Sequence, residues 1–323
     1  MTKFRFRTLL AALTLAGVVT ASAEDFPTRP IRLVVPYPPG GTTDIMARVL
    51  QEPMAKFLGQ PVIVENKPGV AGMIGTLEVA RGKADGYTLL FANNGISIAP
   101  FLQKTAEFDP RTSLAAVSRV SRAPFFLTVG SRVPVTDVAG FIEYVKGRPD
   151  KVLYASAGPG SFGHLASELF AQRAGLKMVH VPYRGQAPTT QAILAGEVEM
   201  LLSTTSSQMN AFISEGKVKL LGVSSAEPSP LAPPGTAVIA KTLPSYVVDV
   251  WFGILVASGT PPDVVAKLNA ALVATLAAPD IQQRFAGFGV EAAASTPAEL
   301  NGIIAAEVPE WQKIIVERGI KAE

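Results

Sequence analysis

The most informative stretch of the chain is the run Ile31-Arg32-Leu33-Val34-Val35-Pro36-Tyr37-Pro38-Pro39-Gly40-Gly41-Thr42-Thr43-Asp44-Ile45-Met46-Ala47-Arg48. It begins as an apolar, β-type strand, turns through prolines and glycines, and continues as a helix with hydroxyl and Asp caps. Free backbone N–H groups and the positive end of the helix dipole meet at such a junction. The run therefore predicts an anion-binding site, although a tight turn before a capped helix explains the same residues.

The first 23 residues form a separate unit. Lys3, Arg5 and Arg7 precede an apolar stretch over 9–19, and Ala21-Ser22-Ala23 is a small-residue cleavage site. This pattern is typical of a secretory signal peptide. We therefore expect export to the periplasm with cleavage after Ala23. No later stretch has the roughly 18 to 20 consecutive apolar residues of a membrane helix, so we expect no membrane insertion.

The mature chain is balanced in charge. The signal peptide holds three of the 29 Lys and Arg residues and none of the 26 Asp and Glu residues, so the formal charge falls from +3 to zero. The electrostatic argument for a nucleic-acid partner disappears with it. The absence of cysteine excludes disulfides, thiolate metal sites and a lipid-modified N-terminal Cys. With two histidines in the whole chain, we expect neither a metal nor a cofactor.

Short apolar runs alternate with amphipathic stretches from Ile31 onward. Strands are predicted over 31–37, 61–66, 87–92, 124–129, 152–156, 178–183, 198–203, 218–224 and 250–256. Helices are predicted over 44–58, 72–81, 137–147, 163–174, 187–195, 205–215, 262–277, 280–286 and 297–318. This alternation predicts an α/β fold with mostly parallel sheets, and the length favours two lobes. Pro53 is expected to kink its helix or end it early, and the Pro-rich segment 226–237 to form an extended loop.

The second half repeats the build of the first junction. Strand 152–156, which ends at Ser156, runs into Ala157-Gly158-Pro159-Gly160-Ser161-Phe162-Gly163 and then a helix starting at His164. In open α/β sheets, ligands bind beyond the carboxyl ends of the strands. Two such turns facing each other across a cleft would each hold one end of a small anion.

This second turn also matches two other motifs. Gly158, Gly160 and Gly163 fit the dinucleotide pattern Gly-x-Gly-x-x-Gly, but Pro159 interrupts the turn and the next strand ends without an acid for the ribose. Ser161 and His164 suggest a nucleophile and base, yet the Gly-x-Ser-x-Gly pattern fails and no Asp completes a triad. We therefore interpret His164 as a polar lining residue or ligand donor, and His180, in an apolar strand, as structural.

Other strand ends carry further candidates. Arg184, beside Gly185, would form a bidentate pair with a carboxylate, or else pair with Glu197 or Glu199. In the hydroxyl run 203–207, Thr205 caps a helix, binds a ligand, or does both.

The stretch Asn93-Asn94-Gly95 closes the strand at 87–92. It indicates a turn first and ligand-lining amides second. Trp251, in the last predicted strand, lines the hinge or cleft, or lies in the core.

Several ordered motifs then identify a family. They are Pro36 to Asp44, Val64-Glu65-Asn66-Lys67-Pro68-Gly69, Ala84-Asp85-Gly86-Tyr87-Thr88-Leu89-Leu90, Val181-Pro182-Tyr183-Arg184-Gly185, Trp251-Phe252-Gly253, and Trp311 with Gly319-Ile320. Together with the signal peptide they resemble the Bug family, the periplasmic solute-binding receptors of tripartite tricarboxylate transporters. The resemblance covers essentially the whole mature chain.

The resemblance implies a two-lobed, type II-like periplasmic-binding-protein fold with two crossover hinge segments. Lobe one would comprise roughly 24–125 plus 250–323, and lobe two roughly 126–249. The carboxylate-clasping loop of the family maps onto Tyr37 to Asp44, and the opposing loop onto Ser156 to His164. Asn93-Asn94, Glu199 and Ala257-Ser258 depart from the usual family residues, at positions that bear on the distal ligand contacts.

The sequence thus predicts a monomeric, non-enzymatic receptor. It would capture a small carboxylate, such as a di- or tricarboxylate, an acidic amino acid or an aromatic acid, and deliver it to the permease subunits of a membrane transporter. A sensory subunit that presents its ligand to a membrane kinase and a periplasmic hydrolase acting through Ser161 and His164 are the alternatives. The expected ligand-binding residues are Tyr37, Gly40, Gly41, Thr42, Thr43, Asp44, Asn93, Ser156, Gly158, Ser161, His164, Arg184, Gly185 and Thr205.

Overall fold

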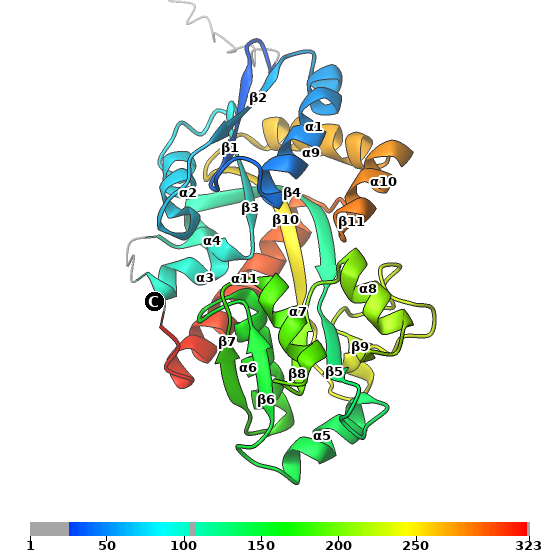
Figure 1. Cartoon of the computed structure of the whole chain (residues 1–323). Coiled ribbons are helices and arrows are strands. Elements are labelled where there is room, and N and C mark those ends of the chain that lie inside the picture. Colours follow the sequence, from blue (N-terminus) through cyan, green and yellow to red (C-terminus); the bar gives the residue numbers. More distant parts are fainter. Residues whose placement is uncertain (1–25, 104–107, 322–323) are drawn as a thin grey trace, which may run out of the picture.

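A computed structural model describes residues 26–103 and 108–321, so the expected signal peptide and its cleavage site lie outside the described residues. The chain forms two mixed β-sheets flanked by helices, stacked one above the other in Figure 1. This confirms the predicted two-lobed α/β fold. Within the described ranges no single helix is long and apolar enough to cross a membrane, while one pair of consecutive helices, bent by 78°, passes by length and composition only.

The first sheet has six strands in the order β11-β4-β10-β3-β1-β2. Their bounds are β1 Ile31–Val35, β2 Val62–Asn66, β3 Thr88–Asn93, β4 Leu114–Pro124, β10 Asp249–Ala257 and β11 Glu291–Ala292. Strand β1 runs parallel to β2 and β3, whereas β10 runs antiparallel to β3 and β4, and β11 antiparallel to β4. One face is covered by α1 (Thr42–Leu58), α9 (Pro262–Leu276) and α10 (Pro279–Gly287). The other is covered by α2 (Met73–Ala80), α3 (Gly95–Leu102) and the first part of α11 (Pro297–Glu317).

The second sheet has five strands in the order β7-β6-β8-β5-β9. Their bounds are β5 Phe126–Gly130, β6 Leu153–Ser156, β7 Val179–Pro182, β8 Met200–Ser203 and β9 Val218–Val223. Strand β6 runs parallel to β7 and β8, and β5 runs antiparallel to β8 and β9. Helices α5 (Val138–Lys146) and α6 (Phe162–Ala174) cover one face, and α7 (Gln186–Ala195) and α8 (Ser207–Ser214) the other. Short helical turns lie at α4 (Pro110–Ser113), η1 (Val70–Gly72) and η2 (Ile239–Lys241).

Every predicted strand and helix is present, within two residues of its expected ends. Helix α1 continues past Pro53 to Leu58 and ends at Gly59 in the left-handed conformation, so the expectation of an early end is wrong. The segment 226–237 is a loop, as predicted. Strand β4 and helix α3 were not predicted. Buried Ser118 and Ser121 obscure the apolar pattern of β4, and the first residue of α3, Gly95, reads as part of a turn.

Both sheets are mixed, but most strands of each run in one direction, as predicted; β10 and β11 are reversed in the first sheet and β5 in the second. A strand-helix-strand unit gives a parallel pair only where the chain returns to the same sheet after the helix. Here the chain leaves the first sheet at the end of β4, builds the second sheet, and returns as β10. The returning strand lies between β3 and β4 and runs antiparallel to both.

The two passages between the sheets lie side by side. Strand β4 ends at Pro124 and β5 begins at Phe126, while β10 starts at Asp249, which is paired with Pro124. These passages correspond to the two hinge segments that the family resemblance implies. Helix α11 also bridges the two sheets: it supplies Leu300, Ile304 and Val308 to a core of the first sheet and Trp311, Ile314 and Ile315 to a core of the second.

A buried polar network fixes the returning strand. The Oδ1 atom of Asn94 accepts a hydrogen bond from the Trp251 amide at 2.8 Å, and its Nδ2 donates to the Asp249 carbonyl at 3.2 Å and to Glu307 at 2.7 Å. The indole of Trp251 also donates to Glu307, at 3.0 and 3.1 Å. Trp251 therefore lies in the core at the hinge. Burial raises the pKa of Glu307 to about 8, against the opposing effect of these hydrogen bonds.

Glu307→Gln should remove a pH dependence of stability. The folded-state pKa of about 8 lies above the ordinary 4.5, so folding takes up a proton between these values and the free energy of unfolding falls as the pH rises through this window. E307Q keeps an acceptor for Asn94 and Trp251. Between pH 5 and pH 8 the free energy of unfolding of the parent should fall by up to about 4 kcal/mol more than that of E307Q. Urea unfolding of both proteins across this range measures the difference. Parallel pH profiles would contradict it.

Candidate ligand-binding site

The loop between β1 and α1 is held from within by a buried carboxylate. Asp44 accepts hydrogen bonds from the Gly40 amide and from Asn66 Nδ2, both at 2.9 Å, and pairs with Arg48 at 3.0 Å. Burial opposes the ionisation of Asp44, but the bonds from Arg48, Gly40 and Asn66 outweigh it and hold its pKa below the ordinary value. Asn66 also donates to the Tyr37 carbonyl at 3.1 Å. Asp44 and the Gly40 amide are thus engaged in fixing the loop.

The first turn of α1 keeps unpaired donors. Gly41 precedes the helix in an extended conformation (φ −77°, ψ 165°), and no side chain caps the helix. The amides of Thr42 and Thr43 have no acceptor within the described part of the chain. They point from the positive end of a 17-residue helix, as an anion requires.

The opposing loop, between β6 and α6, is also held from within. The Ser156 hydroxyl lies 3.1 Å from the Gly158 carbonyl and 3.2 Å from the Gly158 amide. The Gly160 amide donates to His164 Nδ1 at 3.1 Å. Ser161 caps α6, since its Oγ accepts a hydrogen bond from the His164 amide. Both hydrogen bonds to His164 involve a backbone amide, and no hydrogen bond joins the Ser161 hydroxyl to the His164 ring in the described structure.

His164 and His180 form a stacked pair, with ring centroids 3.8 Å apart and planes 11° from parallel. His180 Nε2 lies 2.7 Å from Ser156 Oγ, so the pair supports the loop at both of its ends. Burial lowers the pKa of each ring to about 4. The pair lines a cavity of about 600 Å³ with Glu168 and Arg318, on the side of the loop near the end of α11.

Tyr37 and Asn93 line a different cavity, of about 260 Å³, between the sheets. The Tyr37 hydroxyl donates to Asn93 Oδ1 at 2.9 Å, and the Gly95 amide donates to the same oxygen at 2.9 Å. Its walls come from both halves of the chain, with Ile98, Ala99 and Leu102 from α3, Gly160 and Phe162 from the second loop, and Val250 from β10. The sequence identified the second loop but not the walls from α3, because α3 was not predicted.

A strained turn completes this cavity. Val70 and Ala71 have φ values of 47° and 53°, in the left-handed region that residues other than glycine avoid. Ala71 lines the cavity, and a Cβ added at the neighbouring Gly72 would lie 3.4 Å from the Tyr37 ring. In the sequence, this turn could have been recognised from the two glycines that flank it, Gly69 and Gly72. Such strain persists where surrounding contacts impose it, which is common at ligand sites.

The turn before α7 lies against the second loop, since the Gly185 amide donates to the Ala157 carbonyl at 3.3 Å. Arg184 is exposed and forms no ion pair with the described residues. Neither expected alternative partner holds it: Glu197 accepts from the Tyr183 hydroxyl at 3.0 Å, and Glu199 accepts from the Leu153 amide at 2.8 Å.

Thr205 lies at a second contact between the halves. Its hydroxyl donates to Asn210 Oδ1 at 2.6 Å. It lines a cavity of about 230 Å³ together with Gly289, where an added Cβ would come within 3.1 Å of the Thr205 carbonyl. Four of the fourteen predicted ligand residues thus line three separate cavities, namely His164, Tyr37 with Asn93, and Thr205, and the other ten line none of these cavities.

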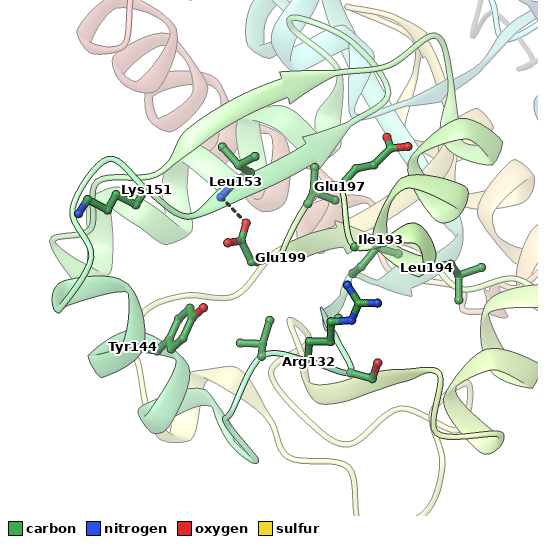
Figure 2. Close-up of a pocket in the computed structure, with 13 residues that line it drawn as sticks. Arg132, Tyr144, Lys151, Leu153, Ile193, Leu194, Glu197 and Glu199 are labelled. Atoms are coloured by element: carbon green, nitrogen blue, oxygen red, sulfur yellow. Dashed lines mark hydrogen bonds between the residues drawn. The ribbon is translucent and has the colours of Figure 1, made fainter.

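A further cavity, of about 350 Å³, lies elsewhere on the second sheet (Figure 2). It is lined by Arg132 and Lys151 but also by Glu197 and Glu199. Helix α7 ends beside it at Gly196, so the negative end of the helix dipole faces this region. Its electrostatics are unsuited to an anion.

The family model described as the tripartite tricarboxylate transporter family receptor matches residues 46–320. The chain belongs to this family. BugT of Bordetella pertussis is 32% identical to the receptor over 309 residues, which cover 95% of this chain and 94% of BugT.

Two solved structures extend the comparison. A TctC solute-binding protein from Polaromonas, without ligand, is 27% identical, covers 90% of the receptor and 99% of its own chain, and gives a TM-score of 0.84. Rpa4515 of R. palustris, with adipate, is 31% identical, covers 92% and 99%, and gives a TM-score of 0.69. The family and these structural neighbours are substrate-binding proteins. The predicted resemblance to the Bug family is confirmed.

His164→Asn should separate support of the loop from titration. The folded-state pKa of about 4 lies below the ordinary 6.5, so the unfolded chain takes up the proton first and stability is lost as the pH falls through this window. Between pH 7 and pH 5 the free energy of unfolding of the parent receptor should fall by about 2 kcal/mol more than that of H164N.

H164N retains an acceptor for the Gly160 amide, so its free energy of unfolding at pH 7 should lie within about 1 kcal/mol of the parent value. That of H164A should be lower by about 1 to 3 kcal/mol. Urea unfolding at both pH values measures these differences. Equal stabilities of H164N and H164A at pH 7 would show that the hydrogen bond to Gly160 does not support the loop.

Proposed function

We propose that the receptor captures a small organic carboxylate in the periplasm, between its two sheets, and delivers it to the permease of a tripartite transporter. The unpaired amides of Thr42 and Thr43 at the start of α1 are the observation that carries this proposal. They present donors and a positive dipole end beside a loop that Asp44 keeps rigid. A rigid donor set loses little conformational entropy when the anion binds.

The second sheet offers the same chemistry. Helices α6, α7 and α8 begin at the carboxyl ends of β6, β7 and β8, and the first-turn amides of Phe162, Gln186 and Ser207 have no acceptor in the described ranges. Ligands of α/β proteins bind at such strand ends. Charge-assisted hydrogen bonds contribute about 1.5 to 3 kcal/mol each, so a few from each sheet would make binding favourable.

Hinge motion about the two passages would bring these donors together. The ligand-free neighbour gives a higher TM-score than the adipate-bound one, 0.84 against 0.69, although its sequence is less similar, 27% against 31%. This order supports an open arrangement of the receptor that closes on its ligand. The predicted signal peptide supports the periplasmic location.

Thr42→Pro tests the clasp directly. Thr42 is the first residue of α1, where proline is tolerated, and the extended conformation of Gly41 is compatible with a following proline. The substitution removes one unpaired N–H group and should weaken carboxylate binding about 10- to 100-fold. Isothermal titration calorimetry with an acid selected from a thermal-shift panel gives the affinity.

Thr42→Ala is the matched control, because it removes the hydroxyl and keeps the N–H group. T42A should bind within about threefold of the parent, and the urea midpoints of all three proteins should agree. If T42P binds as tightly as T42A, the amides of α1 do not hold the carboxylate. Mass spectrometry of ligand released from receptor purified out of the periplasm identifies the natural acid.

A further inference from the structure

We infer that the preferred ligand is a carboxylic acid with an apolar ring as its body, rather than a hydroxylated di- or tricarboxylate. The inference rests on the proposed function and concerns the part of the ligand beyond its carboxylate. The cavity of about 260 Å³ between the sheets is the only space described above to which Tyr37, at the start of the clasping loop, contributes a wall. Its size suits a small ring.

The walls of this cavity are mainly apolar. Ile98 and Leu102 come from α3, Phe162 from the start of α6, and Val250 from the returning strand. No charged side chain lines the cavity in the part of the chain that the structure describes. A second or third carboxylate placed there would lose its hydration without gaining an ion pair.

Most polar side chains of the cavity are engaged in hydrogen bonds, and Gln103, which also lines it, is exposed. Tyr37 donates to Asn93, and Asn94 is bound to Asp249, Trp251 and Glu307. The Gly95 amide is an obligate donor to Asn93 Oδ1, so the amide orientation of Asn93 is fixed and its Nδ2 is directed elsewhere.

Asn93 Nδ2 has no acceptor among the described residues. Away from the exposed Gln103, a ring with at most one acceptor group matches this single donor, whereas hydroxyl groups of a sugar acid or of citrate buried there would remain unpaired.

Both halves of the chain take part in this selection. A Cβ added at Gly160 would lie 2.8 Å from Leu102 Cδ1, so the second loop already touches α3. The aromatic side chain of Phe162 follows two residues later. A ring held between Leu102 and Phe162 would therefore contact one wall from each sheet. Closing the hinge would bury the apolar surface of the ring and favour ligands that have such a surface.

The test combines a ligand panel with one polar substitution. Benzoate and cyclohexanecarboxylate should bind at least tenfold more tightly than malate and citrate in calorimetric titrations. Leu102→Gln keeps the size and the helix propensity of the side chain, and it should weaken binding of the two ring acids about tenfold. Binding of malate should change less than twofold.

Leu194→Gln is the control, since Leu194 is half-buried like Leu102 but lines the cavity shown in Figure 2. L194Q should leave every affinity unchanged. Preferential binding of malate or citrate would overturn the inference and leave the proposed function standing, as would an equal loss of ring acids and malate in L102Q. If none of the four acids binds to folded receptor, and no other carboxylate shifts its melting temperature, the proposed function fails as well.

Discussion

The site depends on the pairing of two strands that cross between the sheets. β4 and β10 run antiparallel from Leu114 and Ala257 at one end to Pro124 and Asp249 at the other. β3 pairs with β10 only as far as Asn93, opposite Phe252. Beyond that point the Asn94 side chain replaces the missing strand, bonding the Trp251 amide and the Asp249 carbonyl. Because both passages are anchored at one level, any motion between the sheets would be confined to a hinge there.

The loops β1–α1 and β6–α6 share one arrangement of hydrogen bonds. In the first, Asp44 accepts the Gly40 amide, and in the second, His164 accepts the Gly160 amide. Each loop is fixed through an acceptor from the helix that follows it, while the amides of Thr42 and Thr43 in α1 and of Phe162 in α6 have no acceptor among the described residues. The residues that the sequence singles out as ligand donors therefore divide into those that shape a loop and those whose backbone faces the gap. Asp44, which accepts three donors, belongs to the first group.

Local patterns predicted most of the fold, because the spacing of apolar residues is enough to identify a strand or a helix that buries one face. The failures arise where tertiary contacts override local signals. Ser118 is buried in β4 because its hydroxyl reaches the Ser295 carbonyl at 3.0 Å, 177 residues away. Glu307 meets Asn94 across 213 residues. The strand-to-helix turns were visible as Gly and Pro motifs, but the walls supplied by α3 were not. An apolar side chain gives no sign in the sequence of which cavity it lines.

The turns that offer backbone donors to a charged group are visible in the sequence, whereas the walls that give the cavity its shape are not. Under the proposed function an anion would be held by backbone N–H groups, which depend on loop conformation and hence on the glycines, prolines and capping residues that form the family motifs. The cavity beyond it is shaped by side chains of α3 and α6, which lie largely outside those motifs. Substitutions in these walls would change the volume and polarity offered to the body of a ligand without altering the donors of the clasp. A family sharing about a third of its residues can thus keep one way of holding carboxylates while its members select different acids.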